Sequence, residues 1–347
     1  MTRLSLAAGA CGLLLAVQSS AAQTSPIQGT NETAAYRATS LEPDDPFALP
    51  RTPEGRPDFQ GVVWAGNHFA MLEAMPMMLP RELALSEEKA KQAFDRMMAM
   101  FLNNPMIKTV LETDPEASAL LTETEGLPIV RGERRTRLVV MPADGKLPYT
   151  PEARRHASGE MSRMAAMKSD NPEDRTLGER CVALGGKPPM AMISSLHPRR
   201  FVQTPEHIVL QSEYGDETRI IPFAAEHGPA ALQRPFGDSI ARWDGDTLVI
   251  ETTNFPAGDT VRGAFPIGLI VNPDAKVIER YTRTSNDELL YQFTVEDPKA
   301  YSAPWLAEYS YFRAPFRMFP SGCHEANYSL PNILRGQRVA DERAAKK

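Results

Sequence analysis

The stretch RWDGDTLVIETTNF, from Arg242 to Phe255, decides the fold class of this chain. Its centre, Asp244-Gly245-Asp246, is a tight-turn signal, and the β-branched and apolar residues that follow favour a β-hairpin. Four more β-type runs surround it: HIVLQSE from His207, TRIIPF from Thr218, KVIERYTR from Lys276 and ELLYQFTV from Glu288. Turn signals separate these runs and no long helix intervenes, so we expect consecutive strands to pair antiparallel.

We therefore predict a mainly β protein, whose antiparallel meander closes into a barrel-like core of lipocalin or calycin type. The sequence predicts a single β-rich domain over 58–340, preceded by a proline-rich extended arm over 23–57 and followed by a charged tail over 341–347. Helical insertions are expected near 86–104, where Ser86 is a good N-cap, and near 151–168, where Pro151 occupies the permitted first position.

Residues 1–22 have the pattern of a signal peptide, with one charge at Arg3, an apolar run from Leu4 to Val17, and small residues before position 23. A lipid anchor on Cys11 is the alternative, but the most apolar part of the run follows that cysteine. No later stretch reaches the roughly 18 consecutive apolar residues of a membrane span. These features predict a periplasmic or secreted protein.

The formal net charge is −6, with acidic and basic residues interspersed along the chain. No basic stripe indicates nucleic-acid binding, and no glycine-rich phosphate loop indicates a nucleotide. We expect a small-molecule ligand or substrate and no organic cofactor. The oligomeric state is left open.

Two cysteines, Cys181 and Cys323, remain once the signal peptide is removed. An even pair in an oxidising compartment predicts a disulfide bond. Two buried thiols, or one reactive thiol, are the alternatives.

Strand periodicity selects three charged residues. In KVIERYTR, Glu279 shares a face with Val277 and Tyr281, while Glu251 and Arg242 each share a face with an apolar residue on their own strands. A buried charge is costly unless it is paired, so an inward charge should meet an opposite charge or a ligand.

His324 follows Cys323 directly, so a disulfide there would hold its backbone still. In a cofactor-independent acid–base enzyme, His324 would act as the base, Glu279 or Glu251 as the acid, and Arg242 would stabilise developing negative charge. A purely structural role is the alternative for each of these residues.

Metal binding has weaker support. The six histidines are scattered singly, without zinc-site spacing. Methionine thioethers can bind Cu(I), but they also fill irregular apolar gaps. The clustered methionines are Met75, Met77, Met78, Met97, Met98, Met100, Met161, Met164 and Met167.

Six segments together resemble a family of exported bacterial proteins of uncharacterised function. They are TPEGRPDFQGVVW from Thr52, LGERC from Leu177, FVQTPEHIVL from Phe201, GDSIARWDGDTLVIETTNF from Gly237, VIERYTR from Val277 and CHEANYSLPNIL from Cys323. The resemblance implies that the hairpin and the surroundings of the two cysteines are family features. It carries over no activity, cofactor or catalytic residue.

The predicted function is the handling of a small, partly apolar molecule inside the barrel. The protein would be a lyase, isomerase or hydrolase that uses acid–base chemistry. The alternatives are a noncatalytic lipocalin-like carrier and a methionine-rich copper-binding protein.

Overall fold

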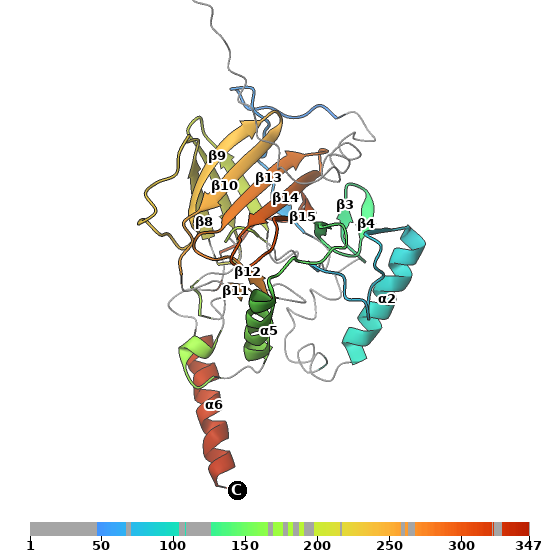
Figure 1. The fold of residues 1–347 in the computed structure, drawn as a ribbon. Coiled ribbons are helices and arrows are strands. Elements are labelled where there is room, and N and C mark those ends of the chain that lie inside the picture. Colours follow the sequence, from blue (N-terminus) through green and yellow to red (C-terminus); the bar gives the residue numbers. More distant parts are fainter. Residues whose placement is uncertain are drawn as a thin grey trace, which may run out of the picture.

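The computed structural model describes residues 47–66, 71–103, 108, 126–165, 169–175, 180–182, 187–190, 198–215, 217–257, 261–262, 268–320, 322 and 328–346. The predicted signal peptide, most of the predicted arm, Cys323 and His324 lie outside these ranges. Figure 1 shows one large sheet with helices to the side of it and below it.

The large sheet has ten strands, and every pairing in it is antiparallel. Its main path runs β8-β7-β6-β1-β15-β14-β13-β10-β9, and β5 pairs with β15 off this path. The strands are β1 (Trp64–Ala65), β5 (Val139–Met141), β6 (Arg199–Gln203), β7 (His207–Ser212), β8 (Glu217–Pro222), β9 (Asp238–Asp244), β10 (Thr247–Thr253), β13 (Lys276–Arg283), β14 (Glu288–Glu296) and β15 (Trp305–Arg313). The predicted mainly antiparallel β architecture is confirmed.

The strand order corrects the single predicted meander. One meander consists of β6, β7 and β8, and the other consists of β9, β10, β13, β14 and β15. The two-residue strand β1 joins them by pairing with both β6 and β15. Trp64 in β1 is fully buried, and its indole Nε1 donates to the backbone oxygen of Phe59 at 3.1 Å. The segment just after the predicted arm therefore completes the sheet.

Both predicted helices are present, as α2 (Glu87–Asn103) and α5 (Pro151–Ala165). A 3-10 turn, η1, covers Pro172–Asp174, and α6 (Ser329–Ala345) projects from the body in Figure 1. The sequence did not predict α6, which takes in most of the charged tail. Short strands form two further sheets: β2 (Ala84–Leu85), β4 (Glu133–Arg135) and β3 (Ile129–Val130) in one, and β11 (Val261–Arg262) with β12 (Leu269–Ile270) in the other.

Alternation along the strands sets an inner and an outer face of the large sheet. In β13 every second residue is buried, from Val277 through Glu279 and Tyr281 to Arg283. Because cross-strand partners share a face, the inner face continues onto β14 and β15 through Tyr291 and Tyr309. The main apolar core lies against this inner face.

The two ends of the sheet, β8 and β9, come close together. Arg219 in β8 contacts side chains of β9, β10 and β13, which lie at the far end of the strand order. The sheet must therefore curl strongly. Within the described residues no backbone ladder joins β8 to β9, so a closed barrel is not established.

A second apolar cluster packs beside the large sheet, around α2. It contains Met71 and Met97, with Met75, Met78 and Met98 partly buried against it. These methionines pack among alanine and leucine side chains, as expected for residues that fill apolar gaps. Among the described residues, no helix is long and apolar enough to cross a membrane.

Candidate functional site

A buried ion pair lies at the centre of the curled sheet. Glu279 is 0 % exposed and Arg219 is 5 % exposed, and Arg219 Nη2 donates to Glu279 Oε2 at 2.7 Å. Alternation fixes both side chains inward, since Glu279 lies between Val277 and Tyr281 on β13, and Arg219 precedes Ile221 by two on β8. Pairing offsets the cost of burying each charge.

Two tyrosines satisfy the second carboxylate oxygen. Tyr291 and Tyr281 donate their hydroxyl groups to Glu279 Oε1 at 2.8 and 3.3 Å. Burial, followed by the negative charge of Glu279, raises the pKa of both phenols well above the usual value. Both tyrosines therefore stay neutral at physiological pH and act as hydrogen-bond donors to the carboxylate.

Of the three side-chain nitrogens of Arg219, only Nη2 donates hydrogen bonds to described residues. Besides Glu279, Nη2 contacts Ser239 Oγ at 3.0 Å and Thr252 Oγ1 at 3.2 Å, and these two hydroxyl oxygens lie 2.9 Å apart. Nη1 and Nε are buried, and no described residue offers either of them an acceptor. Buried polar groups normally have hydrogen-bond partners, so these donors are available to a further oxygen.

A second polar group extends across the inner face from Glu279. Tyr309 accepts from Arg199 Nη1 at 3.3 Å and donates to the backbone oxygen of Met190 at 2.7 Å, while the Met190 N–H donates to the Tyr291 hydroxyl at 3.0 Å. Tyr311 shares a short hydroxyl contact with Tyr309. The backbone of Met190 therefore joins both groups into one network.

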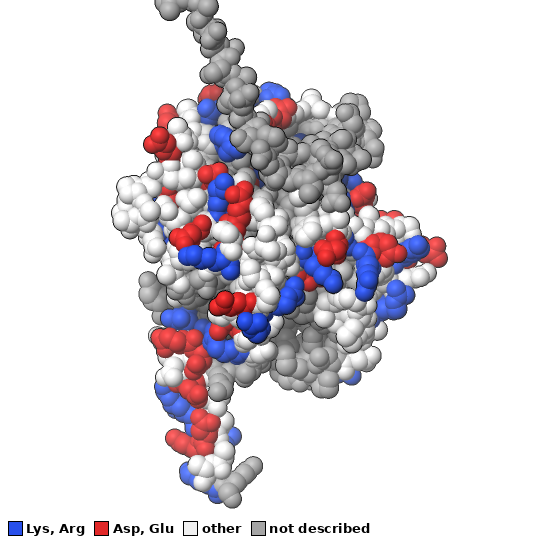
Figure 2. Space-filling model, viewed as in Figure 1, with Lys and Arg blue, Asp and Glu red and all other residues white. Residues whose placement is uncertain are grey.

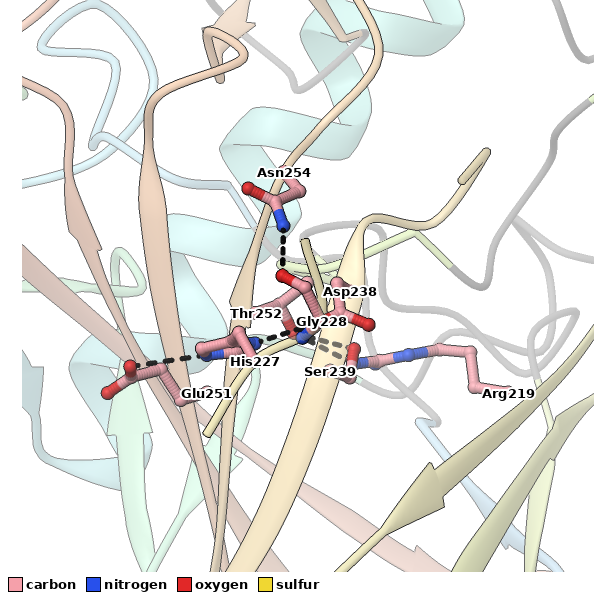
Figure 3. A network of polar contacts seen from close by, with 8 residues as sticks. All are labelled: Arg219, His227, Gly228, Asp238, Ser239, Glu251, Thr252 and Asn254. Atoms are coloured by element: carbon pink, nitrogen blue, oxygen red, sulfur yellow. Dashed lines mark hydrogen bonds and ion pairs between the residues drawn. The ribbon is translucent and has the colours of Figure 1, made fainter. Parts of the chain in front are cut away.

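A third cluster lies on the opposite face of the β9–β10 hairpin (Figure 3). His227, in the connection from β8 to β9, has Nδ1 3.0 Å from Asp238 Oδ2 and Nε2 3.3 Å from Glu251 Oε1. Asp238 directly precedes Ser239, and Glu251 directly precedes Thr252, which are the two hairpin residues that contact Arg219. Neighbouring residues in a strand point to opposite faces, so the side chains of Asp238 and Glu251 point away from Arg219. The Gly228 N–H also donates to Asp238, at 2.8 Å.

One further buried carboxyl lies on the outer face of β15. Glu308 is 1 % exposed and lies 3.3 Å from the guanidinium nitrogens of both Arg131 and Arg135, near the β3–β4 hairpin. Burial raises the pKa of Glu308 to about 8, although the two guanidinium groups favour its charged form. This cluster fixes the hairpin against the sheet and is separate from the interior.

The structure does not gather the predicted catalytic residues into one site. Glu279 lies in the interior, whereas Glu251 contacts His227 on the other face, and Arg242 is exposed on β9. The register pairs Arg242 with Val249 and Glu251 with Ile240, which places both charges on the outer face of the hairpin. His324 and Cys323 lie outside the described residues, so the base and the Cys181–Cys323 disulfide remain predictions.

Sequence reasoning did not single out Arg219, yet a signal was present. In TRIIPF, Arg219 and Ile221 share one face while Thr218 and Ile220 share the other. The two-residue period of β8 therefore places Arg219 on an apolar face, as the period of β13 does for Glu279. The meeting of the two residues depends on the curl of the sheet, which strand periodicity does not specify.

Neither the distribution of surface charge nor the arrangement of possible metal ligands indicates a further binding site among the described residues. Acidic and basic side chains are interspersed on the face shown in Figure 2. In the part of the chain that the structure describes, no group of three or more His, Cys, Asp or Glu side chains is arranged to hold a metal ion.

Comparison with known proteins adds no family assignment: no protein-family model matches this chain, and no curated protein matches it significantly.

Proposed function

We propose that this protein binds a small, partly apolar molecule inside the curled sheet, with Arg219 contacting the polar end of the molecule. One observation carries the proposal: a buried guanidinium group has donors on Nη1 and Nε that no described residue accepts. The surrounding inner face is mostly apolar and aromatic, as in small-molecule sites with a few placed polar groups.

Binding fits this geometry better than acid–base catalysis does. Both oxygens of Glu279 are already engaged, one by Arg219 and the other by two tyrosine hydroxyls. A general acid or base needs a position within hydrogen-bond reach of the reacting proton. The other candidate acid, Glu251, contacts His227 on the opposite face.

The proposal extends to the finer architecture and the location of the protein. A lipocalin-like barrel is supported by the reach of Arg219 from one end of the sheet to the other. Export is supported by the charged, apolar and small-residue pattern of the first 22 residues, and by the resemblance to exported bacterial proteins.

Native mass spectrometry of the protein, purified after export, tests the proposal. We expect an organic mass that is retained under native conditions and lost under denaturing conditions. The neutral fluorophore N-phenyl-1-naphthylamine should also bind saturably and compete with that molecule. A clean protein mass together with no saturable fluorophore binding would contradict the proposal, and a copper-sized increment would favour the methionine cluster instead.

A further inference from the structure

We infer that the ligand presents an uncharged oxygen acceptor, such as a ketone or amide carbonyl, to Arg219, and not a carboxylate or another anion. This inference rests on the proposed binding function and specifies the ligand class. It follows from the donors on Nη1 and Nε of Arg219, which have no acceptor among the described residues, and from the negative charge of Glu279 beside Arg219.

Three hydrogen-bond donors of Arg219 have no acceptor among the described residues. A guanidinium group carries five N–H donors, two on each terminal nitrogen and one on Nε. The two on Nη2 face three oxygens, those of Glu279, Ser239 and Thr252. The remaining three, on Nη1 and Nε, are buried and meet no acceptor among the residues described. A ligand oxygen at this place would satisfy donors that are costly to leave unbonded.

The charge balance decides which kind of oxygen fits. Arg219 is already neutralised by Glu279, which is fully buried at 2.7 Å. An anionic ligand beside Arg219 would add a second negative charge near Glu279, and burying such a charge without its own partner is strongly unfavourable. A neutral carbonyl accepts the same hydrogen bonds without that cost.

The neighbouring side chains favour an apolar body for the ligand. Across the sheet, Glu279 pairs with Ile250 on β10 and with Phe293 on β14, and both are fully buried on the inner face. The ligand class is therefore an apolar or aromatic molecule with a neutral carbonyl-type oxygen.

Three probes with one shared body test the inference: acetophenone carries a neutral acceptor, benzoate carries an anion, and toluene carries neither. Isothermal titration of the full mature protein should show acetophenone binding at least about tenfold more tightly than the other two, as expected for a hydrogen bond to a charged group. The preference should disappear in Arg219→Lys, which keeps a positive charge opposite Glu279 but removes Nη1 and Nε.

Arg280→Lys is the matched control, because Arg280 lies on the outer face of β13 and pairs with Asp244. It should bind all three probes as the natural sequence does. Tightest binding of benzoate, or equal binding of all three with no effect of Arg219→Lys, would overturn the inference and leave the binding function intact. Failure of all three probes to bind would overturn both the inferred ligand class and the proposed binding function. Circular dichroism of Arg219→Lys separates a lost donor from a lost fold.

Discussion

The substitution Glu279→Gln tests the buried ion pair most directly. It removes the charge opposite Arg219 while the side chain keeps nearly the same size. A glutamine has only one acceptor oxygen, and an NH2 group with two donors takes the place of the other oxygen. It therefore cannot accept from Arg219 on one side and from the two tyrosine hydroxyls on the other. Removing one partner of a buried pair costs about 3–5 kcal/mol. For a domain of this size, that loss corresponds to a fall in Tm of roughly 6 to 20 °C.

Differential scanning calorimetry measures the change, and urea unfolding gives the matching free energy. The control is Glu296→Gln, since Glu296 pairs with Lys276 at 2.9 Å where both side chains are about one-third exposed. This control should cost less than about 1 kcal/mol. In the double variant Arg219→Met, Glu279→Leu, much of the loss should be recovered, because two apolar side chains need no charge balance. A small effect of Glu279→Gln, with no coupling to Arg219, would refute the reasoning.

Three other predictions concern the frame around the site. Trp64→Ala, in the strand that joins the two meanders, should cost about 3–5 kcal/mol in urea unfolding, whereas Ala in place of the exposed Phe319 should cost almost nothing; equal costs would contradict the joining role of β1. Gly237→Ala should destabilise the folded protein by about 1–2 kcal/mol more than Gly245→Ala. Both glycines have positive φ, but only at Gly237 would a new Cβ lie 2.7 Å from atoms of β10. Similar Tm values of the two variants would argue against that close approach. Protein recovered from an oxidising compartment should be two hydrogens lighter than its thiol form, and Cys181→Ser should remove that deficit and cost about 2–5 kcal/mol; an intact mass without the deficit would rule out the disulfide.

Local pattern predicts most of the strands and the inward position of Glu279. The turn signals and the two-residue period in KVIERYTR depend on neighbouring residues alone, and the structure confirms that Glu279 lies on the buried face. Residues Pro151 and Ser86 likewise mark where α5 and α2 begin. These features are local consequences of sequence.

The remainder depends on contacts between distant residues. Strand β1 is only two residues long, so it has no period to detect, yet it sets the order of the sheet. The same limit applies to Glu251 and Arg242. Strand periodicity shows which neighbours share their face, but not whether that face lies inside or outside the curled sheet. Their side chains lie outside the curl, and Glu251 meets His227 from a loop that carries no strand or helix signal.

The meeting of β8 and β9 explains why the candidate site lies where it does. Arg219 contacts Ser239. Four residues further along the chain from each of them, Phe223, just past the end of β8, stacks on Trp243 in β9, so the two strands run in the same direction. In the described chain their edges are not joined by a backbone ladder. Side-chain contacts must then hold β8 and β9 together. The guanidinium group of Arg219 can make these contacts through Nη2 and still have donors on Nη1 and Nε for another acceptor. The same arginine can therefore hold the two ends of the sheet together and bind a ligand, and different measurements report the two roles: the unfolding free energy of Glu279→Gln reports the first, and the probe preference of Arg219→Lys reports the second.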